Sequence, residues 1–346
     1  MPRQPDDPRA VTIYDVARES GVAASTVSRA FSRPGRVSPA TADRIHEAAR
    51  RLGYRANPLA RAVTTGRTAI IGLVVSDVTN PVYFPVIRGA QAAAADRDLT
   101  VLLTDAEESA RKEREGIDRA LPMVDGVLLA GSRMSDAAIR VVAQRLPVVV
   151  CNRAVAGVAS VVTDNARGIR RAVEHLGSLG HTTVTYLAGP EASWADGMRW
   201  RAVREAAHEL ELRAVRVGPS VPTVAGGVAA TDSVLRHDPT AVVAYNDLLA
   251  IGLLRGLALA GVRVPADVSV VGFDNIFGSD FCTPALTTVA APLRALGTEA
   301  VTHLAAQLAG AAPHAGAPIV LPARLVIRES TAPVRRQRRR KSTSPA

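Results

Sequence analysis

Residues 12–31 read TIYDVARESGVAASTVSRAF, and this stretch predicts two short helices joined by a tight turn. The first helix has one apolar face at helical spacing, formed by Ile13, Val16 and Ala17. Gly21 interrupts this pattern where a turn needs a residue with left-handed backbone. The helical period then resumes on a second helix with Val27, Ala30 and Phe31.

A third helix is expected next, because two short helices cannot enclose a core. Ser38 followed by Pro39 is typical of a helix start, and Gly53 is typical of a helix end. Between them, one face is apolar through Ile45, Ala48, Ala49 and Leu52. Three short helices with a polar, arginine-bearing second helix are typical of a helix-turn-helix DNA-binding unit, here with its motif at about residues 13–32.

The positive charge of the chain lies at its two ends. The 346 residues carry a net charge of +10. Residues 1–67 carry +6, from 12 arginines against 6 acidic residues, and RRQRRRK at 335–341 carries another +6. Residues 68–334 therefore carry −2. Basic ends on a near-neutral body indicate a module that binds a polyanion, joined to a regulatory body.

The composition disfavours several classes of protein. Hydrophobic residues make up 47% of the chain, yet no apolar run reaches the roughly 18 residues of a transmembrane helix. The N-terminus lacks the apolar stretch of a signal peptide, so we expect a cytoplasmic protein. Cys151 and Cys282 are then expected to be reduced, and no Cys and His spacing suits a metal.

From residue 69 onward, short apolar strands alternate with helices. The expected strands are AIIGLVV (69–75), TVLLTD (100–105), GVLLAG (126–131), PVVVCN (147–152), TVTYLAG (183–189), AVVAYND (241–247) and VSVVGFDN (268–275). The expected helices are 86–97, 109–120, 136–145, 166–179, 198–210, 225–236 and 247–260. This alternation predicts parallel sheets with helices on both faces, and its length exceeds one core, so two α/β lobes are expected.

Polar residues follow these strands directly. Ligands of parallel α/β sheets bind outside the carboxyl ends of the strands. The candidate positions are therefore 77–80, Asp105, Asn152, Arg153, Asn246, Asp247, Asp274 and Asn275.

The chain resembles the lactose-repressor (LacI/GalR) family of bacterial transcription regulators over about residues 11–332. The resemblance rests on the head motif T-I-Y-D-V-A…G-V-A…S-T-V-S-R-A-F and on YRANPLARAV, VSDVTNP, YNDLLAIG and SVVGFDN. It implies an all-α helix-turn-helix head, a hinge helix and a periplasmic-binding-protein-like α/β core of two doubly wound parallel-sheet lobes. It also implies a homodimer on a palindromic DNA operator, with a small effector, most often a sugar, between the lobes.

The resemblance also sets the expected domain boundaries. The head would span 1–56, the hinge helix and linker 57–67 and the core 68–332. Lobe 1 of the core would comprise 68–165 plus 293–322, and lobe 2 would comprise 166–292 plus 323–332. Residues 333–346 would form a disordered basic tail.

DNA contacts are assigned by resemblance to the head and the linker. The residues facing base edges would be Ala24, Ser25 and Arg29. Arg29 suits guanine, because a guanidinium can donate to O6 and N7 together. Phosphate contacts would come from Tyr14, Thr26, Ser28, Tyr54 and Asn57. The residues alone leave open a phosphate contact or a solvated side chain for Arg29, and core packing for Tyr14 and Tyr54.

Three positions depart from the family pattern. Ala60 and Val63 would enter the minor groove, where the family usually has leucine in place of Val63. Valine is shorter and β-branched, so a smaller kink in the DNA is expected. Ala56 replaces a proline, and Ala23 replaces the serine that commonly caps the recognition helix, a loss of about 1 kcal/mol.

Effector contacts in the core are assigned by resemblance to Arg199, Asn246 and Asp274. A carboxylate accepts from two vicinal hydroxyls, while Arg and Asn donate to sugar oxygens. Further candidates are strand-end polar residues and aromatic residues that offer a sugar ring a flat surface: Asn80, Tyr83, Phe84, Asn152, Arg153, Trp194 and Phe281. Core packing is the alternative for each aromatic residue, and a helix cap at a lobe crossover is the alternative for Asp164 and Asn165.

Other functions have less support in the sequence. No nucleophile elbow, phosphate loop or metal cluster appears, so we expect neither an enzyme nor a cofactor. A sugar-binding transport receptor would explain the core but not the head. An activator, a corepressor-dependent regulator and a nucleoside or phosphorylated effector stay open. The tail has no apolar heptads, so a dimer rather than a tetramer is expected, with the tail either solvated or in nonspecific contact with DNA.

Overall fold

The protein is described by a computed structural model that covers residues 11–32, 35–54, 66–313 and 316–334. The chain divides into two compact units, Met1–Ala69 and Ile70–Ala346. Each unit has its own core, and each is described by itself below.

The first unit contains three helices, as the sequence predicts. They are α1 (Ile13–Ser20), α2 (Ala24–Ser32) and α3 (Pro39–Leu52). The backbone N–H and the hydroxyl of Thr12 both donate to the Asp15 carboxylate, which fixes the start of α1. Gly21 and Gly53 end α1 and α3 in the left-handed region, with φ of 65° and 67°. The core between the helices consists of Val16, Val27, Ala30, Ile45, Ala48 and Ala49.

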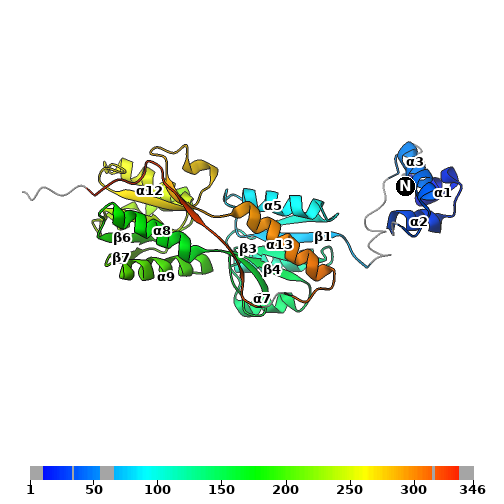
Figure 1. Cartoon of the computed structure of the whole chain (residues 1–346), viewed down its shortest axis with the longest axis horizontal. Coiled ribbons are helices and arrows are strands. Elements are labelled where there is room, and N and C mark those ends of the chain that lie inside the picture. Colours follow the sequence, from blue (N-terminus) through cyan, green and yellow to red (C-terminus); the bar gives the residue numbers. More distant parts are fainter. Residues whose placement is uncertain (1–10, 33–34, 55–65, 314–315, 335–346) are drawn as a thin grey trace, which may run out of the picture. The chain divides into compact units, whose positions relative to one another are not determined.

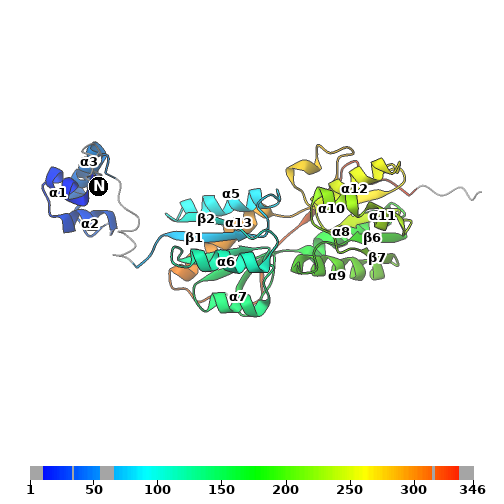
Figure 2. The same ribbon diagram turned by 180° about the vertical axis from the view of Figure 1, so that it is seen from behind.

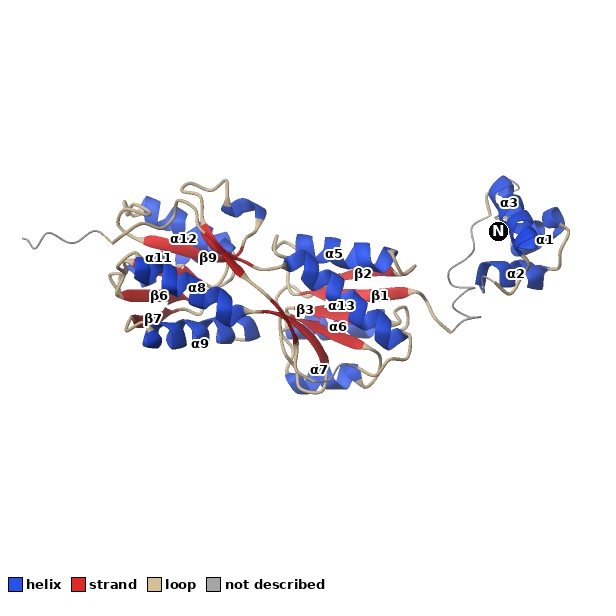
Figure 3. Ribbon diagram, in the orientation of Figure 1, coloured by secondary structure: helices blue, strands red, loops and turns tan. Residues whose placement is uncertain are grey.

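The second unit contains two six-stranded sheets (Figure 3). The first sheet has the order β11-β5-β4-β3-β1-β2 and is parallel throughout. Its strands are β1 (Ile70–Val75), β2 (Thr100–Asp105), β3 (Gly126–Ala130), β4 (Val148–Cys151), β5 (Ala159–Thr163) and β11 (Ile319–Leu321). We call this sheet and its helices lobe 1.

The second sheet has the order β12-β10-β9-β8-β6-β7, and only its edge strand β12 is antiparallel. Its strands are β6 (Thr183–Leu187), β7 (Arg213–Val217), β8 (Ala241–Ala244), β9 (Ser269–Asp274), β10 (Thr287–Ala290) and β12 (Arg324–Val326). We call this sheet and its helices lobe 2. In both sheets the strand order reverses next to the first strand of the lobe, the arrangement that places a ligand at the carboxyl ends.

Helices cover both faces of the lobe 1 sheet (Figures 1 and 2). One apolar cluster joins the sheet to α5 (Tyr83–Ala95) and α13 (Leu293–Leu308), and another joins it to α6 (Ala110–Ala120) and α7 (Asp136–Ala143). In lobe 2, α8 packs against α9 and α10 against α12. The lobe 2 helices are α8 (Asn165–Ser178), α9 (Trp194–Glu209), α10 (Val224–Ala229), α11 (Thr231–Leu235), α12 (Asp247–Leu259) and the 3₁₀ turn η1 (Phe277–Ser279).

The chain passes between the lobes three times. The passages are at residue 164, at residues 291–292 and at residues 322–323. Helix α13 thus returns to lobe 1 before the last strand of lobe 2, β12, is added, and its backbone touches that of α5. A Cβ at Gly89 would lie 2.1 Å from the Arg294 carbonyl oxygen, and one at Gly297 would lie 2.1 Å from the Val86 carbonyl oxygen. Only glycine permits this close crossing of the two helices.

The predicted fold class, an α-helical head with a two-lobed parallel α/β core, is confirmed. Each predicted strand and each predicted helix of the head and the core has a counterpart, although the predicted helix 225–236 is two helices, α10 and α11. The predicted hinge helix falls in the linker, most of which lies outside the described residues. Helices α5 and α9 begin earlier than predicted, at Tyr83 and Trp194. The elements that the pattern did not predict are β5, β7, β10, β11, β12, α13 and the 3₁₀ turn η1. Within the described residues, no helix is both long and apolar enough to span a bilayer.

Candidate functional site

The exposed face of α2 carries the residues predicted to read bases. Val27 and Ala30 are buried against the other two helices of the head. Ser25 and Arg29 are exposed and lie one turn apart, so they share a face. The remaining predicted residues of α2, Ala24, Thr26 and Ser28, are half-buried. Helix α2 therefore offers a hydroxyl and a guanidinium on one accessible strip.

The two tyrosines of the head have different surroundings. Tyr14 on α1 is 70% exposed, so its hydroxyl is accessible to a phosphate. Tyr54 packs on the head core, with its ring 5.7 Å from Phe31, and burial raises its pKa. Core packing thus accounts for Tyr54, and its phosphate contact stays a prediction. Asn57, Ala60 and Val63 lie outside the described residues.

Polar side chains from both lobes line one cleft at the carboxyl ends of the two sheets. Of the effector-contacting residues predicted from sequence, those that line it are Asn80, Tyr83, Asn152, Arg153, Trp194, Arg199, Asn246 and Asp274. The lining residues that the sequence reasoning missed include Ser76, Glu108, Ser132, Arg133, Ser193 and Tyr245. Most of the predicted residues that line the cleft were identified by their position directly after a strand.

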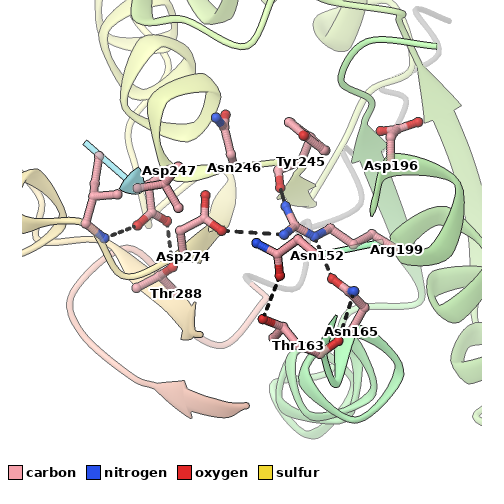
Figure 4. A network of polar contacts seen from close by, with 12 residues as sticks. Asn152, Thr163, Asn165, Asp196, Arg199, Tyr245, Asn246, Asp247, Asp274 and Thr288 are labelled. Atoms are coloured by element: carbon pink, nitrogen blue, oxygen red, sulfur yellow. Dashed lines mark hydrogen bonds and ion pairs between the residues drawn. The ribbon is translucent and has the colours of Figure 1, made fainter. Parts of the chain in front are cut away.

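Arg199 of α9 holds the lobe 2 side of the cleft together (Figure 4). Its Nε donates to Asn165 Oδ1 at 3.0 Å, and its Nη1 donates to the Tyr245 carbonyl oxygen at 2.5 Å. Its Nη2 lies 3.4 Å from the Asp274 carboxylate. The guanidinium also lies 3.5 Å from the centre of the Phe273 ring. Asn165 begins the first helix after a lobe crossing, so this network also fixes that crossing, while Asp164 is the cap of α8.

Two buried carboxylates, Asp274 and Asp247, lie on the lobe 2 side of the cleft. Burial raises the pKa of Asp274 to about 6, although Arg199 lowers it. Asp247 is fully buried and accepts from the Ile276 N–H at 2.8 Å and from the Thr288 hydroxyl at 2.6 Å. Burial, and secondly the charge of Asp274, raise the pKa of Asp247 to about 8. Asp247 therefore lies behind the cleft with a raised pKa, while Asp274 lines the cleft.

These raised pKa values predict a stability that falls as pH rises. A group whose pKa is higher in the folded state takes up a proton on folding. Its stabilising contribution is complete below the unfolded pKa and is lost as pH rises through the folded pKa. For Asp247 the window runs from about 4 to about 8, with a slope of at most about 1.4 kcal/mol per pH unit. Urea unfolding of Asp247→Asn between about pH 5 and pH 8 should show a shallower pH dependence than the wild type. Equal slopes would contradict a raised pKa at this residue.

Lobe 1 contributes a second set of ion-paired side chains. Arg133 is paired with Glu108 through two contacts, of 2.6 Å and 3.0 Å. The Ser76 hydroxyl donates to Glu108 at 2.9 Å and lies 2.7 Å from the Tyr83 hydroxyl. We call Ser76, Tyr83, Glu108 and Arg133 the lobe 1 wall of the cleft.

Arg153 and Asn152 complete the lobe 1 side. Arg153 donates to the Met134 carbonyl oxygen at 2.6 Å and to Asp136 at 2.5 Å. Its Nε is buried and has no hydrogen-bond partner among the described residues. Asn152 Oδ1 accepts from the Thr163 hydroxyl at 3.0 Å, which leaves its amide N–H groups for a ligand.

Some predicted residues lie elsewhere. Phe84 does not line the cleft: its side chain is 49% exposed, and its ring stacks on Phe277 at 6.3 Å. Phe281 is 69% exposed and packs on the same Phe277. Asp105 does not line the cleft and accepts instead from the backbone N–H groups of Val78 and Glu107. Phe84 thus lies outside the cleft that Tyr83 lines, because neighbouring positions of a helix point about 100° apart.

The cleft residues also share an unusual backbone. The non-glycine residues with positive φ next to the cleft are Glu107 (47°), Glu108 (57°), Asn152 (58°), Asp274 (114°) and Asn275 (59°). Such conformations cost about 1–3 kcal/mol each and persist where the surroundings impose them, commonly at ligand sites. Their clustering here is an independent indication that this cleft is the functional site of the core. No group of His, Cys, Asp and Glu side chains in the described residues is arranged to hold a metal.

Comparisons with known proteins cover both units of the chain. Residues 12–57 match the family model described as bacterial regulatory proteins, lacI family, and residues 173–331 match the periplasmic binding protein-like domain. The chain is 34% identical to the transcriptional repressor CytR of Escherichia coli K12, over 93% of this chain and 96% of that protein. It is 34% identical to the transcriptional regulator GalS of Salmonella typhimurium, over 86% of this chain and 89% of that protein.

Solved structures give the same result. The lac repressor dimer bound to operator and the anti-inducer ONPF matches with a TM-score of 0.83 and 26% identity, over 94% of this chain and all of that chain. The complex of the regulator CelR with cellobiose matches with a TM-score of 0.69 and 30% identity, over 92% and 99% of the two chains. These relatives are transcription regulators and not enzymes, in agreement with the sequence. From its head, its two-lobed core and these relatives, the chain is a DNA-binding transcriptional regulator of the lacI family.

Proposed function

We propose that this regulator is a repressor that binds a palindromic operator as a homodimer and is controlled by a sugar bound between its lobes. The observation that carries the proposal is the cleft, where both lobes present hydrogen-bonding side chains to one space. The head, residues 1–56, would read the operator, the linker 57–67 would enter the minor groove, and the core 68–332 would bind the effector. The protein would act in the cytoplasm, with residues 333–346 as a basic tail.

A neutral polyol suits the side chains of the cleft. Asp274 and Glu108 are hydroxyl acceptors, and Asn80, Asn152 and Asn246 carry amide groups. Trp194, Tyr83 and Tyr245 offer flat apolar surfaces to a sugar ring. Each lining arginine already has a carboxylate partner, in the pairs Arg133–Glu108, Arg153–Asp136 and Arg199–Asp274. This pairing favours a sugar over a phosphorylated metabolite, the alternative that the sequence left open. Among the structural relatives, one is a complex with cellobiose and another, from Enterococcus faecalis V583, is a complex with ribose.

Control of DNA binding by the effector would be a coupling between two sites. The effector would change the arrangement of the lobes, and with it the separation of the two linkers of the dimer. Linkage requires that the operator weaken effector binding by the same factor as the effector weakens operator binding. Measuring the operator affinity of the full-length protein with and without saturating effector tests this coupling, and an unchanged operator affinity would rule it out.

The first experiment is enrichment of genomic DNA fragments on the purified protein at about 150 mM salt. A shared palindrome among the enriched fragments is the expected result, and the genes beside it identify the sugar to test. No enrichment above nonspecific background, with or without a panel of sugars, would contradict the proposal.

A cluster of exposed aromatic rings supports the dimer. Phe84 of lobe 1 stacks on Phe277 of lobe 2, and Phe277 contacts Phe281 at 5.6 Å. These side chains are between 49% and 69% exposed, in a chain where aromatic residues are only 3% of the total. Contiguous exposed aromatic surface of this kind is typical of a protein interface. The lac repressor relative is itself a dimer. We therefore assign this aromatic cluster to the contact with the second copy.

The aromatic cluster predicts a monomeric variant. Phe277→Arg places a charge at the centre of the cluster, which burial in a dimer would desolvate at high cost. Sedimentation velocity should show a dimer for the wild type and a monomer for the variant at the same concentration. Val141→Arg is the matched control, because Val141 on α7 is 49% exposed but lies outside the cluster. A dimeric Phe277→Arg protein would exclude this surface from the interface.

A further inference from the structure

The lobe 1 wall contains one cation and one carboxylate that neutralise each other. The Arg133 side chain is only 7% exposed, and that of Glu108 is 25% exposed. Two of the guanidinium nitrogens contact the two Glu108 oxygens in the fork-to-fork geometry of a strong pair. Arg133 also donates to the Gly131 carbonyl oxygen at 3.0 Å. The nearby carboxylate of Glu113 accepts from the Arg133 backbone N–H, not from its guanidinium.

The backbone of the loop after β2 is strained where it presents Glu108. Glu107 and Glu108 are consecutive residues in the left-handed region, with φ of 47° and 57°. Two such residues without glycine or asparagine cost free energy, so tertiary contacts must hold them there. The Glu108 backbone N–H donates to the Ser76 carbonyl oxygen at 2.5 Å, and Ser76 also donates to the Glu108 carboxylate. Glu107 points elsewhere, since its side chain is 62% exposed and pairs with Lys112.

The other arginines of the cleft are fixed by several partners each. Arg199 and Arg153 each contact their carboxylate through one nitrogen and donate otherwise to uncharged oxygens. Arg133 instead gives two of its nitrogens to Glu108 and one to the Gly131 carbonyl oxygen. The pair with Glu108 is therefore what decides whether the lobe 1 wall carries an accessible positive charge. Without Glu108, Arg133 would be a nearly buried cation beside a ligand cavity, and such a group binds phosphate readily.

We propose that Glu108 is a specificity-determining residue that makes the cleft reject anionic ligands, so that neutral sugars are accepted and their phosphate esters are excluded. The carboxylate acts in two ways. It occupies the guanidinium of Arg133, and it repels a phosphate that approaches the lobe 1 wall. Discrimination of this kind arises from an unfavourable element against the wrong ligand and not from better contacts to the right one. The inference deepens the proposed sugar function and rests on it for the identity of the accepted ligand.

The test uses the full-length protein and inorganic phosphate as the probe. Glu108→Gln keeps the size of the side chain and removes its charge. Isothermal titration with phosphate, at constant ionic strength, should show binding to Glu108→Gln at least about tenfold tighter than to the wild type. The double variant Glu108→Gln/Arg133→Met should lose this gain, because the cation is gone. Glu107→Gln, which removes a neighbouring exposed charge, should behave as the wild type.

A parallel titration identifies the accepted ligand. D-ribose, D-galactose, D-glucose and cellobiose are compared with ribose 5-phosphate, galactose 1-phosphate and glucose 6-phosphate. The wild type should bind one neutral sugar and not its phosphate ester. Glu108→Gln should bind the ester more tightly, so that the ratio of the affinities for the sugar and the ester falls at least about tenfold.

Two results would overturn the proposal. One is unchanged phosphate affinity in a folded Glu108→Gln protein, and the other is a gain that persists without Arg133. Failure of the proposed sugar function gives a different pattern: the wild type binds none of the sugars, while Glu108→Gln still gains phosphate. Circular dichroism and urea unfolding of each variant separate these outcomes from misfolding, and Glu108→Ala provides a second charge-free variant.

Discussion

The Arg199→Leu variant should lose all measurable binding of the effector sugar and about 3 kcal/mol of the free energy of unfolding. The guanidinium donates to Asn165, to the Tyr245 carbonyl oxygen and to Asp274, and it stacks on Phe273. Leucine fills part of the space but leaves the Asp274 carboxylate buried without its cation. An unpaired buried charge is what makes the loss of one partner so costly. Asp274, freed of Arg199, should take up a proton more readily, since the arginine is what lowers its pKa.

Two controls separate these effects. Arg201→Leu removes an exposed arginine of the same helix, one that pairs with Glu205 at 2.7 Å on the surface, and should leave stability and sugar binding close to wild type. The double variant Arg199→Leu/Asp274→Asn should recover part of the stability, because no unpaired charge remains, but not the sugar binding. Urea unfolding and sugar titration measure the two quantities separately. Sugar binding that survives in Arg199→Leu would contradict the assignment of the cleft.

The head and the strands could be predicted because their signals are local. An apolar face and a terminal glycine specify α1 and α3, and Gly21 and Gly53 have the left-handed backbone that their positions indicate. The elements that were not predicted lack such local signals. β11 and β12 are three residues long, too short for a period to show, and they exist because they add to the edges of sheets formed by other segments. The α13 helix has a weakly amphipathic pattern, because it is packed against both the sheet and α5.

Only some of the residues that line the cleft could be predicted from the sequence. Strand ends identified Asn152, Asn246 and Asp274, because parallel strands bring their carboxyl ends to one edge. Glu108 and Arg133 were not predicted, because each lies a few residues beyond the end of its strand, in a loop whose direction depends on tertiary contacts. Phe84 lies outside the cleft that Tyr83 lines for a related reason. Adjacent residues of a helix face different surroundings, and only the packing of α5 decides which of them faces the cleft.

Arg29→Lys should strongly lower specific DNA binding, because it keeps the charge and removes the planar fork of the guanidinium. Arg29 is exposed on α2, one turn from Ser25. A bidentate contact to guanine contributes about 1–3 kcal/mol of discrimination, and a homodimer on a palindrome makes the contact twice. Specific operator affinity should therefore fall by about 30-fold or more, while affinity for unrelated DNA and its salt dependence stay unchanged.

The comparison of Arg29→Lys with Arg29→Ala decides between the two roles that the sequence leaves open for this residue. If Arg29 reads a base, both variants lose discrimination, and only alanine also lowers the salt slope, because one positive charge is gone. If Arg29 contacts a phosphate, lysine serves nearly as well, and alanine weakens specific and nonspecific binding together. Fluorescence anisotropy with the enriched operator and with a scrambled duplex, each at several salt concentrations, gives the affinity and the salt dependence of binding for both duplexes. Equal losses on the two duplexes would move the base-reading role from Arg29 to its neighbours Ala24 and Ser25, whose small side chains reach only the nearest base edges.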